Sequence, residues 1–267
     1  MRLRVAANIQ HEVVAGYQPN DQDLRIWRYV DLPRLIDFLE TRSLHFARVD
    51  TLGDPYEGTV TRLNVVAREA QLAVMARDAP PQAGVSAESL RQSFASATTM
   101  LRGTGYVSCW HAGETESAAM WQLYGTTTGT VVLQSTYDRL RRILPDDTRV
   151  GGVPTTVYLG MVQYKDYSSV RDWIPGGNVM YPLMHKRLEF QHEREVRAFI
   201  WNTNILDRPG DGPRGLRVGI EIDDLVETIR VQPTTPTWIR QAIERLLARY
   251  NLRFEVRPSQ IDTPPMF

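Results

Sequence analysis

The stretch QHEREVRAFI, residues 191–200, runs from a cluster of ionisable side chains into a sequence typical of a buried strand. Five of its residues are ionisable, although charged side chains usually lie on solvated faces. Valine, phenylalanine and isoleucine follow, and β-branched and aromatic residues favour strands. Two explanations are open: an exposed or ion-paired strand end, or a set of side chains that lines a functional cleft.

Around this stretch the chain alternates between short strand-like and helical segments. The segment 31–43, DLPRLIDFLETRS, predicts a helix because Asp31 is a good N-cap, Pro33 suits a first turn and apolar residues recur at helical spacing. Another helix is expected at 236–251, and a helix or loop at 180–190. Short strands mixed with helices, without a strict βαβ rhythm, predict an α+β fold with a split mixed or antiparallel sheet flanked by helices. Strands are expected at 24–30, 44–50, 105–111, 129–134, 153–164, 195–201, 216–222, 228–233 and 252–258.

The domain organisation follows from two further helical patterns, at 59–79 and 86–101. The turn-forming stretch APPQAG separates them. They predict a helical insert at about 59–103 within a single domain that spans residues 24–267. Residues 1–23 are expected to be flexible or loosely packed.

Composition restricts the classes of function. The 267 residues carry 31 Lys and Arg against 31 Asp and Glu, which gives no general attraction for nucleic acid or an anionic membrane. Cys109 is the only cysteine, so an internal disulfide is excluded and a reducing, cytoplasmic location is expected. No stretch approaches the roughly 20 apolar residues that span a bilayer, and the N-terminus lacks the apolar core of a signal peptide. No membrane contact is therefore expected.

Several motif-based chemistries are disfavoured. The sequence lacks the P-loop, dinucleotide-binding, HExxH and nucleophile-elbow motifs. Its five histidines are scattered, so no metal site is expected. Glu189 and His192 form a single ExxH pair, while a di-iron carboxylate centre needs two. Cys109 and His111 share a predicted strand face and invite a thiol nucleophile, although a lone cysteine in a strand is more often a small buried apolar residue.

One ordered set of residues carries a more specific chemistry. Arg28 lies in IWRYV of the first strand, Ser108 in YVSCW of a middle strand, and Glu193 and Glu195 form an E-x-E pair at the start of a later strand. This order resembles the Arg, Ser, E-x-E order of the ADP-ribosyltransferases, and the strand-helix-strand pattern over 24–50 looks like the opening of those enzymes. The resemblance implies an ADP-ribosyltransferase-like fold and NAD as the substrate.

Each residue of the set then has an expected role in breaking the nicotinamide glycosidic bond. The cleavage passes through an oxocarbenium-like state, which the Glu195 carboxylate would stabilise while it holds a ribose hydroxyl. The planar fork of Arg28 suits the pyrophosphate of NAD, and the Ser108 hydroxyl would orient the NAD or the catalytic glutamate. Glu193 would orient or deprotonate the acceptor. Three aromatic residues are expected to stack on nicotinamide or adenine: Tyr29, Trp110 and Tyr124.

A second resemblance covers most of the chain from about Trp27 onward. Four groups of motifs occur in an order similar to that of a bacterial family known only as a domain of unknown function, number twenty-nine seventy-one. The resemblance implies kinship in fold and carries no activity. The segments are RYVDLPRLIDFLETRSLHFARVDTLGDPYEG, YVSCWHAGETESAAMWQLYG followed by GTVVLQSTYDRL, KRLEFQHEREVRAFI, and the tail from IEIDDLVETIRVQP to WIRQAIERLLARYNLRFEVRPSQI.

Three functions remain open. The first is an NAD-using ADP-ribosyltransferase or NAD hydrolase, such as a toxin or anti-phage defence effector, with a protein or nucleic-acid acceptor and a neutralising partner. The alternative is a non-enzymatic module that binds a ligand or partner, in which EREVR is a salt-bridged strand end. The third is a metal-dependent nuclease, which would gather Asp54, Glu57 and Glu195 around an ion.

Overall fold

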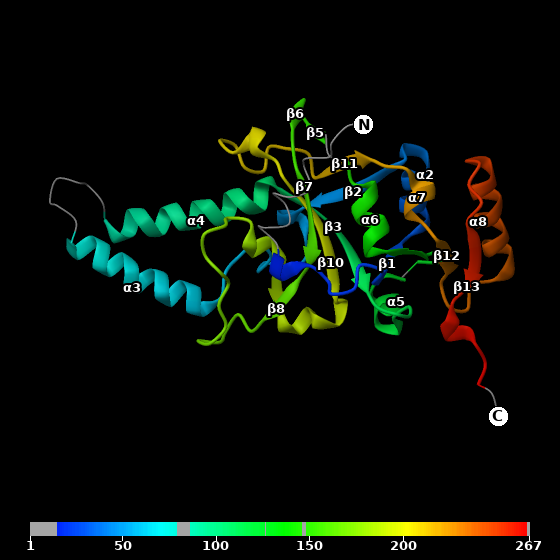
Figure 1. The fold of residues 1–267 in the computed structure, drawn as a ribbon, viewed down its shortest axis with the longest axis horizontal. Coiled ribbons are helices and arrows are strands. Elements are labelled where there is room, and N and C mark those ends of the chain that lie inside the picture. Colours follow the sequence, from blue (N-terminus) through cyan, green and yellow to red (C-terminus); the bar gives the residue numbers. More distant parts are fainter. Residues whose placement is uncertain (1–14, 79–85, 126, 146–147, 266–267) are drawn as a thin grey trace.

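The fold is organised around a mixed sheet, and the computed structural model describes residues 15–78, 86–125, 127–145 and 148–265. Within these residues nine strands form the sheet in the order β11-β2-β3-β1-β4-β12-β13, with β10 beside β3 and β7 beside β10 (Figure 1). Two small separate sheets pair β5 (Arg149–Val150) with β6 (Val153–Pro154) and β8 (Gln163–Lys165) with β9 (His185–Arg187). The strands of the main sheet are β1 (Arg25–Val30), β2 (Ser43–Arg48), β3 (Gly105–Ala112), β4 (Val131–Thr136), β7 (Val157–Met161), β10 (Glu195–Trp201), β11 (Gly215–Gly219), β12 (Thr228–Val231) and β13 (Glu255–Pro258).

Strand β3 is the branch point of this sheet. One of its edges pairs along the strand with β10, from Glu195 opposite His111 to Trp201 opposite Gly105. The other edge is divided, since β2 pairs near its beginning and β1 pairs at its end. Between these two pairings, residues 108–110 of β3 have no strand partner on this edge among the described residues. The sheet is therefore split at β3, and the predicted α+β fold with a split mixed sheet is confirmed.

Helices cover one face of the sheet and build the main apolar core. They are α2 (Leu32–Thr41), α6 (Tyr137–Ile143), α7 (Ile222–Leu225) and α8 (Thr237–Arg249), and each contributes buried residues to that core. Their apolar side chains pack on the inward-facing residues of the strands, which removes a continuous hydrophobic surface from water.

The opposite face carries two smaller apolar clusters with polar residues between them. One cluster includes Val107 of β3, and the other packs Trp27 against helix α5 (Ala118–Tyr124). Because side chains alternate across a strand, Cys109 and His111 point to the same face as Val107. The ladder pairs His111 with Trp27, so these polar residues lie between the two clusters. The fold thereby places polar side chains where the sheet is split.

The predicted start of α2 is confirmed. Asp31 has extended backbone geometry, with φ of −71° and ψ of 166°, and its carboxylate accepts a hydrogen bond of 2.8 Å from the backbone N–H of Arg34. This bond satisfies one of the amide groups that the first helical turn leaves without a partner. Leu35 and Leu39 then point into the main core.

The predicted helical pair is present as α3 (Arg62–Asp78) and α4 (Ala87–Thr104), which together project away from the sheet (Figure 1). Ser86 and Ser89 form a capping box at the start of α4, and the helix leads directly into β3 at Gly105. The turn-forming stretch APPQAG lies outside the described residues. In the part of the chain that the structure describes, no helix is long and apolar enough to cross a membrane.

Three local predictions need correction. The strand expected at 216–222 ends at Gly219, and Ile222 begins α7 because its side chain packs into the main core. The segment 180–190 contains strand β9 between two short 3-10 helices, η3 (Tyr181–Met184) and η4 (Leu188–Glu193). Tyr17, from the N-terminal stretch expected to be loose, is buried, and its hydroxyl oxygen lies 3.3 Å from Nε2 of His185.

Replacing the α2 cap tests the local basis of the fold. The substitution Asp31→Ala removes the bond to Arg34, so we expect the free energy of unfolding to fall by about 0.5–2 kcal/mol. Asp31→Asn is the matched control, since an asparagine oxygen caps the same amide. Urea denaturation measures both variants. Equal stability of the alanine variant and the unmodified protein would show that the cap contributes nothing.

Candidate active site

A cavity of about 640 Å³ opens at the split in the sheet. Ligand pockets typically measure roughly 300–1,000 Å³, so this cavity has room for a small molecule. Side chains from β1, α2, β2, β3 and α5 line it, together with residues at the entrance to β10. Ser108 is not part of the lining, while six of the predicted site residues are: Arg28, Tyr29, Trp110, Tyr124, Glu193 and Glu195.

Arg28 is a half-buried cation in this cavity. Its Nη1 donates to Ser108 Oγ at 2.8 Å, and its Nη2 donates to the His45 carbonyl at 3.0 Å. Its guanidinium carbon lies 5.6 Å from the centre of the Trp110 ring. Burial lowers the pKa of Arg28 to about 10, and the positive charge of Arg34 adds to this effect. No carboxylate of the described residues forms an ion pair with Arg28, so its charge is left for a ligand.

Ser108 orients Arg28 rather than a glutamate. Its hydroxyl accepts the hydrogen bond from Arg28, and in the ladder it lies opposite Ala198 of β10. Glu195 lies three positions earlier on β10, so its side chain points to the other face of the sheet. The predicted contact between Ser108 and the catalytic glutamate is therefore absent among the described residues, whereas a role in positioning the arginine is consistent with the contacts.

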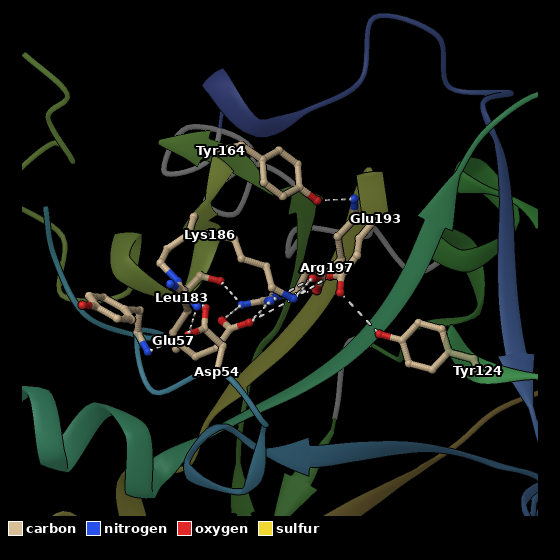
Figure 2. A network of polar contacts seen from close by, with 11 residues as sticks. Asp54, Glu57, Tyr124, Tyr164, Leu183, Lys186, Glu193 and Arg197 are labelled. Atoms are coloured by element: carbon tan, nitrogen blue, oxygen red, sulfur yellow. Dashed lines mark hydrogen bonds and ion pairs between the residues drawn. The ribbon is translucent and has the colours of Figure 1, made fainter. Parts of the chain in front are cut away.

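The charges of the stretch 191–200 converge on Arg197, whose side chain is fully buried. It holds Glu195 through Nε to Oε1 at 2.5 Å and Nη2 to Oε2 at 2.9 Å. It holds Glu57 through Nη1 to Oε2 at 2.9 Å and Nη2 to Oε1 at 3.2 Å. Nη1 also donates to the Leu183 carbonyl at 2.7 Å (Figure 2). These five contacts match the five N–H donors of a guanidinium.

Lys186 adds a second cation to the same network. Its Nζ lies 2.5 Å from Glu193, 3.2 Å from Glu57 and 3.5 Å from Glu195. Burial opposes ionisation of Glu195, but the charges of Arg197 and Lys186 outweigh it and lower the pKa of this carboxyl to about 2. Burial also opposes the charge of Lys186, yet Glu195 and Glu57 raise its pKa well above the usual value. With three carboxylates and two cations, the ionised network carries a net charge of minus one.

The two glutamates of the E-x-E pair lie on different elements, contrary to the expectation of one continuous strand. Glu193 is the last residue of η4, and Arg194 follows in the left-handed region with φ of 40°. Strand β10 begins at Glu195, whose N–H donates to the Tyr164 hydroxyl at 2.8 Å. The left-handed turn brings both carboxylates to the cavity, although the strand includes only one of them.

The aromatic residues predicted to bind a ligand differ in their freedom to move. Tyr29 is buried, packs edge-on against Trp121 at 4.9 Å between ring centres, and accepts a bond of 2.8 Å from the Ser117 N–H. Trp110 is also buried. Tyr124 is 45% exposed, and its hydroxyl lies 3.4 Å from Glu193 Oε1. The first two residues form fixed walls, while Tyr124 lies at the rim.

The thiol hypothesis receives little support from these contacts. Cys109 is exposed to the cavity, where desolvation and the neighbouring Glu195 carboxylate raise the pKa of its thiol well above the ordinary value. The Nδ1 atom of His111 is engaged by the Glu193 carbonyl at 2.7 Å. Because a carbonyl only accepts, this bond places the imidazole proton on Nδ1, and the raised pKa of Cys109 holds its thiol in the protonated, weakly nucleophilic form.

The nuclease hypothesis required carboxylates gathered around an ion. Asp54 instead pairs with Arg187 at 3.0 Å, and Glu57 and Glu195 pair with Arg197. Over residues 15–78, 86–125, 127–145 and 148–265, no group of three or more metal-ligating side chains has the geometry to hold an ion. The carboxylates named for this function are therefore paired with side-chain cations.

Sequence reasoning missed several residues of the site. Glu57 was considered as a ligand of a nuclease metal and Arg197 as part of a salt-bridged strand end, but both belong, with Lys186, to the buried network. Their partnership has no sequence signal, because Glu57 and Arg197 are 140 residues apart. Trp27, in contrast, lies two residues before Tyr29 and shares its strand face, so strand alternation would have indicated it.

Removal of Arg197 tests whether the network holds the site together. We expect Arg197→Met to reduce the free energy of unfolding by about 3–5 kcal/mol, because two buried carboxylates lose their partner. Arg217→Met is the control, since its pair with Asp37 is largely exposed and is expected to contribute about 1 kcal/mol or less. Thermal and urea unfolding measure the difference. Similar losses in the two variants would contradict a special role for Arg197.

Comparison with known proteins yields few matches. No protein-family model matches this sequence, so its resemblance to the bacterial family of unknown function is not confirmed. No curated protein matches it either. Among solved structures, Thermus sp. 2.9 DarT in complex with NAD+ aligns over 92% of this chain and 100% of its own, with 10% sequence identity and a TM-score of 0.38. A likeness of this extent assigns neither a ligand nor an activity to the chain.

Proposed function

We propose that this protein binds NAD in the cavity and breaks its nicotinamide-ribose bond, passing ADP-ribose to a macromolecule or to water. The main observation behind the proposal is that one cavity contains both a positive charge and an excess of negative charge. Arg28 supplies a half-buried cation with no carboxylate partner among the described residues, and Glu193 and Glu195 belong to a network with excess negative charge. A dinucleotide with an anionic centre and a cationic ring complements both.

The pyrophosphate would occupy the end of the cavity near Arg28. Desolvation of an uncompensated guanidinium is unfavourable, and a bound anion offsets that cost through charge-assisted hydrogen bonds. Arg34 and Arg217 also line this part of the cavity. Desolvation at the cavity wall and the neighbouring arginines lower the pKa of His45, so it stays neutral and the arginines provide the positive charge.

Aromatic side chains would hold the rings of the ligand. Trp27, Tyr29 and Trp110 are buried and held by their packing, and all three line the cavity. Flat π-faces of this kind stack on adenine and on the positively charged nicotinamide ring. The rigidity of the walls limits the entropy lost on binding.

The carboxylate end would support the chemical step. When the C1′–N bond breaks, its electron pair goes to the nicotinamide nitrogen, and positive charge develops on the ribose. A preorganised anion beside that carbon stabilises the transition state. The acceptor oxygen or nitrogen, or water, then bonds to C1′ and loses a proton. The low pKa of Glu195 keeps negative charge in this region at neutral pH.

A protein or nucleic-acid acceptor, a cytoplasmic setting and a role as a toxin or anti-phage effector with a neutralising partner complete the hypothesis. A non-enzymatic ligand-binding module is the second candidate. It is favoured by the pairing of both Glu195 oxygens with Arg197, which is the ion-paired strand end expected for such a module. Arg194, the other expected partner, forms no ion pair among the described residues.

Nicotinamide release tests the proposal directly. Purified protein is incubated with NAD, with and without cell lysate, and free nicotinamide is followed by chromatography. We expect release by the unmodified protein, and an increase in KM of roughly 10- to 100-fold in Arg28→Ala, because a hydrogen-bonded charge contributes about 1.5–3 kcal/mol. Arg42→Ala, at an exposed ion pair with Asp223, is the control.

The outcomes separate the two candidates. NAD binding measured by calorimetry without nicotinamide release, in either condition, would favour the binding module. Absence of both binding and release would contradict the proposed use of NAD.

A further inference from the structure

The two carboxylates at the cavity differ in how their oxygens are held. Both oxygens of Glu195 receive close hydrogen bonds from Arg197, at 2.5 Å and 2.9 Å, and Lys186 lies 3.5 Å from Oε2. Its side chain is 3% exposed. Arginine paired in this bidentate way fixes the plane of the carboxylate. A substrate hydroxyl would have to compete with a buried ion pair to reach Glu195.

Glu193 is less constrained. Its Oε2 binds Lys186 at 2.5 Å, while Oε1 has only a long contact of 3.4 Å to the Tyr124 hydroxyl. Tyr124 approaches this carboxylate from the α5 side of the cavity, away from Lys186 and Glu57 (Figure 2). The tyrosine is partly exposed and its contact with Oε1 is long, so a ligand can displace its hydroxyl at little cost. Oε1 of Glu193 is therefore the accessible acceptor of the pair.

The charges of Glu193 and Glu195 are also compensated to different extents by the neighbouring cations. Arg197 is shared between Glu57 and Glu195 through two bidentate pairs. Lys186 is the only described cation in contact with Glu193, and it is also within 4 Å of the other two carboxylates. The charge of Glu195 is thus compensated more fully than that of Glu193. The uncompensated negative charge of the network lies closest to Glu193.

We infer that Glu193 is the carboxylate that contacts the ribose of the substrate and stabilises the positive charge formed as the C1′–N bond breaks. Glu195 is a positioning residue: it fixes Arg197 and, together with Lys186, sets the place of Glu193. This inference rests on the proposed function and reverses the roles expected from the order of the two glutamates in the sequence.

Substitution of each glutamate by glutamine separates the roles. Glu193→Gln keeps the size of the side chain but loses the charge, so we expect kcat for nicotinamide release to fall by about 100-fold or more, with KM close to that of the unmodified protein. The thermal midpoint is expected to fall less than in Glu195→Gln, because Lys186 keeps Glu57 and Glu195 as partners when the charge of Glu193 is lost. Glu195→Gln breaks a buried ion pair, so its main effect is expected on the thermal midpoint, with a smaller loss of kcat. Glu189→Gln, an exposed carboxylate of η4, is the control and is expected to change neither.

Each result decides the matter. Undiminished kcat in Glu193→Gln, or a loss of kcat confined to Glu195→Gln with an unchanged thermal midpoint, would overturn the inference while the proposed function stands. Equal losses of kcat in the two variants, both with unchanged midpoints, would overturn the division of roles as well. Should Glu195→Gln fail to fold, kcat, KM and the thermal midpoint of Glu193→Gln decide alone. If the unmodified protein releases no nicotinamide, the proposed function fails, and the inference with it.

Discussion

The buried guanidinium of Arg197 is the interaction on which the site depends. A charge without exposure to solvent is costly unless its partners have near-ideal geometry, and here two carboxylates and a carbonyl occupy its donors. The partners come from different parts of the chain: Glu57 from the loop after β2, Leu183 from η3 and Glu195 from the start of β10. One side chain therefore joins three segments that share no regular ladder at this point.

The split in the sheet places a cavity beside this network. Strand β3 pairs fully with β10 on one edge but divides its other edge between β1 and β2. The side chain of Arg28 lies at this split and donates a hydrogen bond to Ser108, while Glu193 and Glu195 reach the cavity from the start of β10. Opposite charges thus reach one cavity from separate elements. The charged stretch combines features of the two explanations first offered for it, because Glu193 and Glu195 are ion-paired and also line a cavity.

Local sequence signals predicted most elements but few contacts. The Asp31 cap, the helical pair α3 and α4 and strand β10 follow from patterns within a dozen or so residues, and each was found where expected. The errors occurred where packing overrides pattern. The apolar alternation that ends in Ile222 fits a strand, yet this residue begins α7 and packs into the main core. Likewise, the E-x-E spacing fits one strand face, but a left-handed turn at Arg194 separates the two glutamates.

The sequence by itself determined the α+β class, the order of the elements and the residue types available for chemistry, since these depend on short-range periodicity, capping and composition. It also indicated that Arg28, Glu193 and Glu195 belong together. Only the tertiary structure decided which charges compensate one another. Glu57 and Arg197 are 140 residues apart, and the sequence holds many other acidic and basic side chains that are chemically equivalent as partners. Partner choice depends on burial and on the geometry of converging segments, which exist only in the folded chain.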